Sequence, residues 1–262
     1  MLDQFFQNPR SLGAAQAAIT IGLALAVMLL ARRQNIHLER ETIIALVRGM
    51  VQVVAVGSVL LLLLQAPAWT SVFALLAMVL AAANIAARRA KGMPGAFWVS
   101  LLGIGFGSGL VIVSMTWLGV IESTVSSLIP VGSMLIANAM NTNALALDRF
   151  RAEVESHVGQ IEAALALGAE AKSTVAPYVQ AAVEASLIPR IDSLRSLGIV
   201  WIPGLMAGMI LAGSDPVYAA IYQFVVIAMI FAASGLTSIL STLLIRSRAF
   251  SSAQQLVVRP GG

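Results

Sequence analysis

The chain has 262 residues, of which 59% are hydrophobic and only 11% charged, and its mean hydropathy is +0.90. A soluble core of this size needs far less apolar surface, so we expect an integral membrane protein. No cysteine is present, which excludes disulfides, thiolate metal sites and cysteine nucleophiles together. The pI near 10.1 does not require a nucleic-acid partner, because basic residues also orient membrane proteins and contact anionic headgroups.

Seven apolar runs, the sixth of them short, predict an all-α membrane fold with one transmembrane domain over residues 1–262. They cover about residues 13–31, 42–65, 69–87, 96–120, 129–147, 198–212 and 217–245. The first run, of roughly 19 residues, would give about 28 Å of helix, close to the thickness of the hydrocarbon core. The glycine-rich stretch GIGFGSG (residues 103–109) lies inside the fourth run, with no strand signal before it. This context favours close helix packing or a flexible break over a phosphate-binding loop.

Basic residues segregate strongly between the connections of these runs. With the amino terminus outside, only Arg10 of the sixteen basic residues falls on the outer face. The remaining basic residues fall on the inner face: Arg32, Arg33, Arg40, Arg48, Arg88, Arg89, Lys91, Arg149, Arg151, Lys172, Arg190, Arg195, Arg246, Arg248 and Arg259. The connections near Pro67, Glu122 and Asp215 carry no Lys or Arg. The positive-inside rule therefore predicts an outer amino terminus and a cytoplasmic carboxyl terminus.

The polar passage 149–196 is the only sizeable piece between apolar runs, and it predicts a cytoplasmic hairpin of two short amphipathic helices standing off the bundle. The apolar stripe of the first helix consists of Val158, Ile161 and Leu165, and Gly168 is expected to end it. The stripe of the second consists of Val175, Tyr178, Val179, Ala182 and Val183, and Pro189 is expected to stop it. Such a hairpin would serve as a handle for a soluble partner.

The octet EAALALGA within this passage resembles the coupling loop of ATP-binding-cassette (ABC) permeases. In that loop a Glu-Ala-Ala triplet precedes a Gly, as Glu162, Ala163, Ala164 and Gly168 do here. The match covers the front half only, because residues 178–181 stand where importers have Ile-x-Leu-Pro. The alternative is an ordinary helix end in a hairpin that merely covers the bundle.

Longer stretches resemble the FetB-type ABC permeases, a small family that includes bacterial iron exporters and plant aluminium-tolerance relatives. The second run, RGMVQVVAVGSVL, carries Arg48, Gln52 and Gly57 of its opening signature. The fifth run matches at Pro130, Met134, Asn138, Met140, Asn141, Leu147, Asp148 and Arg149. The later stretch matches at Pro189, Pro203, Gly204, Met206, Gly208, Ile210, Leu211, Gly213, Pro216, Tyr222 and Gln223. The resemblance covers about residues 40–250.

The resemblance implies a permease subunit in a bacterial plasma (inner) membrane, expected to export a metal ion or small molecule by alternating access. Seven helices would be half of a transmembrane unit, which implies a symmetric homodimer with two separate ATPase subunits. No GxxxxGK[ST] motif is present in the sequence, so we expect no cofactor in this chain and place ATP and magnesium in the partner.

Met134, Asn138 and Asn141 form one helical stripe, whose amides would be costly to expose to lipid. Together with Gln52, Met206, Met209 and Gln223 they are the candidate substrate pathway; whether they bind a metal is left unknown. The alternative for the Asn residues is hydrogen bonding between packed helices. Ala207 and Met209 replace a Thr and a Gln of the family pattern, which leaves a more apolar cargo open.

Two other classes of protein are alternatives to an ABC permease. A self-sufficient secondary transporter or channel would need an intramembrane ionisable relay, yet apart from Arg48 the runs hold no central Asp, Glu, His or Lys. An intramembrane enzyme would need an acid/base pair or a metal cluster, and neither is evident. Metal ion, metal chelate, nucleotide sugar and amphipathic small molecule all remain open as cargo, as do the direction of transport and the oligomer.

Overall fold

The structure is a computed structural model that describes residues 8–34, 39–90, 93–251 and 254–258. Ten α-helices make up the regular structure of the described part, together with isolated bridges between Leu197 and Trp201 and between Phe250 and Leu256. The predicted all-α class is confirmed. The predicted placements of Lys91 and Arg259, and of the Arg10 side chain, lie outside the described residues. The chain divides into two compact units, residues 1–65 and 66–262.

The first unit contains α1 (Pro9–Arg33) and α2 (Glu39–Leu64). Both helices expose large apolar side chains around much of their circumference, such as Leu23, Val53 and Leu62. Apolar side chains that stay uncovered in this way are suited to lipid or to other membrane helices. Basic residues gather toward the connection between the two helices, with Arg32 and Arg33 at the end of α1 and Arg40 at the start of α2.

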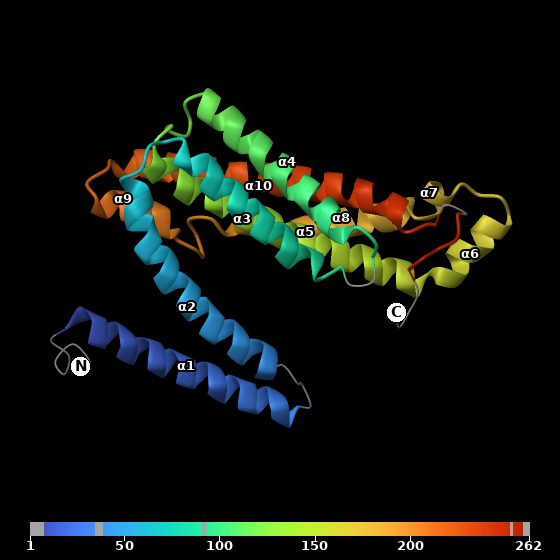
Figure 1. Cartoon of the computed structure of the whole chain (residues 1–262), viewed down its shortest axis with the longest axis horizontal. Helices are drawn as coiled ribbons and strands as arrows, with labels where there is room; N and C mark the ends of the chain where they lie inside the picture. Colours follow the sequence, from blue (N-terminus) through green and yellow to red (C-terminus); the bar gives the residue numbers. More distant parts are fainter. Residues whose placement is uncertain (1–7, 35–38, 91–92, 252–253, 259–262) are drawn as a thin grey trace. The chain divides into compact units, whose positions relative to one another are not determined.

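The second unit is built on five long helices that pack along one another: α3 (Thr70–Ala87), α4 (Ala96–Trp117), α5 (Val125–Ser156), α8 (Ala176–Ser196) and α10 (Pro216–Arg248). Within this unit α4 and α8 run opposite to α3, α5 and α10 (Figure 1). The short helices α6 (Val158–Ala166) and α7 (Ala171–Thr174) lie where α5 and α10 end, and α9 (Gly204–Leu211) lies where α10 begins (Figure 1). The core includes Ile104, Leu135 and Val226, all fully buried.

Glycines bring α4 close to α10, as the sequence predicted for GIGFGSG. Gly103 faces Ser241 and Gly107 faces Thr237. A Cβ at Gly107 would lie 2.7 Å from the backbone N of Thr237 and 3.0 Å from the carbonyl O of Ala233. Because backbone atoms cannot swing aside, this crossing requires glycine.

Five described helices are long and apolar enough to cross a membrane: α1, α2, α3, α4 and α10. The count of seven is therefore not confirmed. The fifth predicted run, residues 129–147, lies inside α5, which is longer than expected and carries several amides and charges. The sixth, residues 198–212, is helical only in α9, whose eight residues span about 12 Å against a hydrocarbon core of about 30 Å.

The segment before α9 explains why the sixth prediction fails. Gly198 has a φ of +76°, and the amides of Ile199, Val200 and Trp201 all donate to the carbonyl of Ser196. The three amides converge on one carbonyl at a left-handed glycine and do not continue the i→i−4 series of a helix, and Pro203 follows this turn. The apolar composition of residues 198–212 therefore wrongly predicted a continuous helix.

The predicted stop at Pro189 is wrong, because α8 continues through it to Ser196. Contacts on both sides of the proline hold the helix: Ser186 Oγ lies 2.7 Å from Ser238 Oγ of α10, and Arg190 Nη1 donates to Asn138 Oδ1 of α5. Tertiary packing thus overrides the local cost of the missing amide. As a result α8 belongs to the bundle, and only α6 and α7 remain at its end.

Candidate functional site

Helix α6 begins immediately after α5 and ends in a glycine turn. The amide of Ala169 donates to the carbonyl of Ala164 and that of Gly168 to the carbonyl of Leu165, both at 3.0 Å. Gly168 has a φ of +86°. These bonds form a Schellman motif with glycine at the left-handed position, which satisfies the last carbonyls of the helix. The predicted end of this helix at Gly168 is confirmed.

The apolar stripe predicted for α6 packs inward. Ile161 is fully buried, and Val158 and Leu165 are partly buried against a core that contains Phe150 and Val179. Glu162, Ala163 and Gly168 are exposed, and Ala164 is half-buried. Leu167 is 89% exposed at the tip of the turn, which is unusual for a leucine. The outer surface of α6 therefore combines one carboxylate, small side chains and a projecting leucine.

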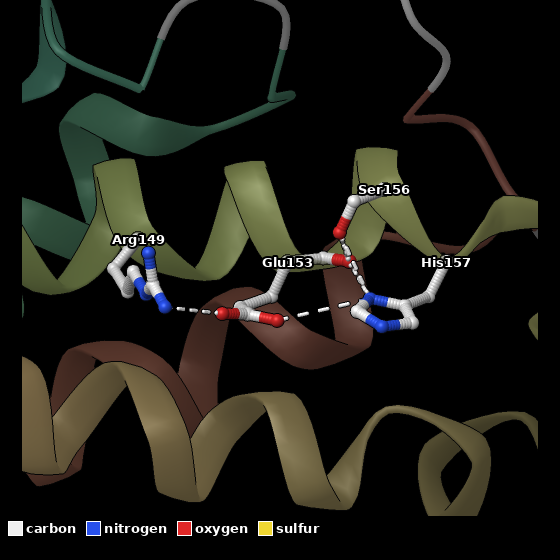
Figure 2. A network of polar contacts seen from close by, with 4 residues as sticks. All are labelled: Arg149, Glu153, Ser156 and His157. Atoms are coloured by element: carbon white, nitrogen blue, oxygen red, sulfur yellow. Dashed lines mark hydrogen bonds and ion pairs between the residues drawn. The ribbon is translucent and has the colours of Figure 1, made fainter.

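The joint between α5 and α6 is held by a polar network (Figure 2). Glu153 accepts from Arg149 Nη2 at 2.7 Å and lies 3.7 Å from His157 Nδ1. The same His157 nitrogen lies 2.8 Å from the carbonyl O of Glu153 and 2.9 Å from Ser156 Oγ. The imidazole stacks on Tyr178 of α8, with ring centroids 4.8 Å apart. The joint therefore ties α6 to both α5 and α8.

A cavity of about 230 Å³ lies between α5, α8 and α10. Its walls contain Met134, Asn138, Arg190, Ser193, Trp201, Ile227, Ile230 and Phe231. It lies beside the middle third of α10, a helix long and apolar enough to span a membrane. Two of the predicted pathway residues, Met134 and Asn138, therefore share a cavity with an arginine that the sequence analysis had placed in a polar connection.

Asn138 is fully engaged in this cavity. Its Nδ2 donates to the carbonyl O of Met134 at 2.8 Å, and its Oδ1 accepts from Arg190 Nη1. Arg190 Nε is buried and has no hydrogen-bond partner among the described residues. The guanidinium of an arginine stays charged at neutral pH.

The other predicted pathway residues are not brought together with this pair. Asn141 is exposed and lines a separate hollow with Arg89 and Asp148. Met209 lines another hollow, with Glu122 and Tyr218, at the end of the bundle where α10 begins.

Gln223 is not among the walls of the cavity. Its side chain is buried, its Oε1 accepts from the backbone N of Met206 at 3.3 Å, and its Nε2 has no partner among the described residues. Gln52 lies on α2 in the first unit and is exposed there.

Arg190 is the residue that sequence reasoning missed, although a signal was present. Val179, Ala182 and Ser186 form the buried stripe of α8, and Arg190 follows Ser186 by four residues. A charge that continues a buried stripe is unusual and indicates a functional or paired group. The expected stop at Pro189 concealed it. The described residues contain no group of three or more His, Asp or Glu arranged to hold a metal.

Sequence comparisons with known proteins show the family of this chain. The model of the uncharacterised protein family UPF0014 matches residues 14–250. "Protein ALUMINUM SENSITIVE 3" of Arabidopsis thaliana is 32% identical over 260 residues, covering 97% of this chain and 95% of the relative. "Probable iron export permease protein FetB" of Escherichia coli is 30% identical over 252 residues, covering 96% and 97%. "UPF0014 membrane protein YjkA" of Bacillus subtilis is 30% identical over 247 residues, covering 91% and 96%. No solved structure matches.

Proposed function

Because the chain belongs to the uncharacterised protein family UPF0014, we propose that it is the permease subunit of an ABC transporter, driven by a separate ATPase subunit. The name of the Escherichia coli relative, an iron export permease protein, supports export as the direction of transport. The other candidate is a self-sufficient secondary transporter or channel in the bacterial plasma membrane, which would not need a handle for a soluble partner.

The observation that carries the proposal is the construction of α6. A helix can transmit motion between subunits only if it is rigidly attached to the membrane part and small enough to enter a cleft of its partner. The Glu153–His157–Tyr178 contacts supply the attachment to α5 and α8. Ala163, Ala164 and Gly168 supply the small surface, and the exposed Leu167 supplies an apolar group to bury in the partner.

The distribution of charge in the second unit supports a cytoplasmic position for α6. Basic residues lie at or beyond the ends of α3, α5 and α10, the end of the unit where α6 and α7 lie (Figure 1). This group consists of Arg88, Arg89, Arg149, Arg151, Lys172, Arg246 and Arg248. Arg190 and Arg195, which were predicted on the same face, lie on α8 within the bundle instead, with Arg190 beside the middle of α5, so the predicted segregation of basic residues is incomplete. Glu122 and Asp215 belong to the connections at the other end. The positive-inside rule then puts α6 where an ATPase would be.

The assembly follows from this arrangement. We propose two copies of this chain, each contacting one ATPase subunit through α6, with ATP and magnesium bound in those subunits. The Met134–Asn138–Arg190 cavity is the proposed substrate site, since it lies beside the middle of α10 and between helices that an alternating-access motion would shift.

The test is a charge reversal on α6 with a matched control. Glu162→Arg should reduce both ATPase stimulation and transport in vesicles that contain the complete complex, while membrane insertion stays normal. Gln160→Arg adds the same side chain at another exposed position of α6 and should change both activities much less. Equal effects of the two substitutions, or full activity in both at normal expression, would show that α6 only covers the bundle.

A further inference from the structure

We propose that the cavity between α5, α8 and α10 binds a small organic monocarboxylate through Arg190, and that it does not bind a bare metal cation. This inference rests on the proposed permease function, for which it names the class of substrate. Three observations support it: one edge of the Arg190 guanidinium has no hydrogen bond, Asn138 is already hydrogen-bonded, and the cavity is small with largely apolar walls.

The guanidinium offers one free edge. Its Nη1 donates to Asn138 Oδ1, and no hydrogen bond within the described part of the chain occupies Nε or Nη2. The Nε–Nη2 edge is a fork of two parallel N–H groups, which matches the two oxygens of a carboxylate. Nε exposes almost no surface whereas Nη2 is accessible, so a carboxylate contacts Nη2 first and completes the fork at Nε only after a local shift, which would also end the cost of leaving Nε unpaired.

The charge of Arg190 is also unbalanced. No carboxylate of the described residues lies within ion-pair distance of it, and the nearest acid in sequence, Asp192, pairs instead with Arg195 at 3.8 Å. The cavity therefore presents one positive charge and no negative charge among its walls. Because a partly desolvated cation is stabilised by an anion in contact with it, a ligand with a single negative charge fits best.

The same residues disfavour a free metal ion. Asn138 Oδ1, the best oxygen ligand in the walls, already accepts from Arg190, and Asn138 Nδ2 donates to Met134 O. A cation placed beside Met134 would also be repelled by the guanidinium. The hydroxyl of Ser193 donates to the carbonyl of Pro189, so it adds no strong ligand.

The remaining walls set the size and polarity of the ligand. A volume of about 230 Å³ is smaller than the range of about 300–1,000 Å³ that is usual for drug-sized ligands. Trp201 and Phe231 add aromatic surface, and Ile227 adds aliphatic surface. The ligand should therefore have a compact apolar body behind its carboxylate. A shallow groove that shares Ser193 and Trp201 with the cavity adjoins it, and Asp192 also lines this groove.

Benzoate is a suitable probe, with benzamide as its neutral isostere and inorganic phosphate as an anion without an apolar body. Binding of each to the full chain in lipid nanodiscs is measured by calorimetry, without an ATPase subunit. We expect saturable benzoate binding and much weaker binding of benzamide and phosphate. Arg190→Gln should weaken benzoate binding about 10-fold or more, as expected for loss of a charge-assisted hydrogen bond.

Two further variants keep the test independent of folding. Arg195→Gln removes an exposed arginine from the same helix and should leave benzoate binding unchanged. Asn138→Asp places a carboxylate of the protein beside Arg190 at the same side-chain size and loses only the bond from Nδ2 to the carbonyl O of Met134. It should neutralise the guanidinium and abolish benzoate binding, and the thermal stability of the variant shows that the fold is retained.

Several outcomes would overturn the inference. Equal binding of benzoate and benzamide, equal binding of phosphate, or retained benzoate binding in Asn138→Asp would each exclude a carboxylate site at Arg190. Binding of a divalent cation that increases in Arg190→Gln would show a metal site instead. A loss of thermal stability in Arg190→Gln without any benzoate binding to the unmodified chain would reduce Arg190 to a clamp between α5 and α8. None of these results depends on whether an ATPase subunit associates, which is measured separately.

Discussion

Replacing Gly168 by alanine should loosen α6 without creating a clash. A Cβ at Gly168 would meet no atom within 4 Å, so the substitution changes only the backbone preference. The φ of +86° is unfavourable for any residue with a Cβ, at a cost of roughly 1–2 kcal/mol. The Schellman bonds at Gly168 and Ala169 should weaken by that amount, because the turn must either strain or open.

The matched control is Gly159→Ala at the other end of α6. Gly159 also has open space around a Cβ, and its φ is not in the left-handed region. Alanine there should stabilise the helix by up to about 1 kcal/mol. Two identical substitutions on one helix are therefore expected to act in opposite directions.

Hydrogen exchange of the amides in residues 158–169 measures this directly. A local cost of 1–2 kcal/mol corresponds to a decrease in protection of about 5–30-fold in Gly168→Ala, whereas protection in Gly159→Ala should stay equal or rise. ATPase stimulation should fall in the first variant only. Unchanged protection in Gly168→Ala, or an equal decrease in both variants, would refute the assignment of Gly168 as a required left-handed cap.

Three further predictions follow from other contacts. Gly107→Ala should lower the free energy of unfolding by about 1–3 kcal/mol, because its Cβ would press on the backbone of α10, whereas Gly109→Ala should not lower it. Denaturation of the purified chain measures both variants, and equal stability of the two would contradict the close crossing of α4 and α10. His157→Ala should reduce ATPase stimulation at normal expression, because it removes the contact with Glu153 and the stacking on Tyr178, which is worth about 0.5–1.5 kcal/mol. Stimulation at the wild-type level would argue against a rigid joint between α5 and α6. Cysteines placed singly at Ser126 and Ser173 of this cysteine-free chain should label from the outer and the cytoplasmic side respectively, and labelling of both from one side would contradict the topology.

Local signals in the sequence predicted α6 well. The spacing of Val158, Ile161 and Leu165 identified its buried face, and a glycine three residues after Leu165 identified its end. Both depend on contacts within a few residues, which a sequence displays directly. Glycines in an apolar helix also indicated close packing, but the sequence did not show that Gly103 and Gly107 contact α10.

Features that depend on distant neighbours were not predictable. Asn138 and Asn141 lie on one predicted stripe, yet Asn138 faces Arg190 of α8 while Asn141 is exposed in a hollow with Arg89. The helical period gives the stripe but not the helices that cover each part of it. Pro189 predicts the end of a helix because proline lacks an amide hydrogen and clashes with the preceding turn, but the packing of α8 on α5 and α10 outweighs this local cost.

Composition predicted one of the two runs near the cavity wrongly, and the other lies in a helix that is less apolar than the membrane-spanning helices. Residues 198–212 are apolar enough for a span but form a turn and the eight-residue α9, because Gly198 and Pro203 break the helix. Residues 129–147 belong to α5, whose polar side chains include the buried Asn143, bonded at 2.9 Å to Ser100 of α4. Asn143 is paired through Nδ2, although its Oδ1 has no partner among the described residues, so its polar side chain lowers the hydropathy of α5 without moving the helix out of the bundle.

The most direct test of the central claim places a photo-crosslinker at Leu167, the exposed tip of α6, and at Ser126, at the other end of the bundle, in the full chain in its native membrane. The proposal predicts that Leu167 crosslinks to a protein that binds ATP through a P-loop and hydrolyses it in the purified complex, while Ser126 does not. Crosslinking of that ATPase at both positions, or active transport by the purified chain without any ATPase, would contradict the account.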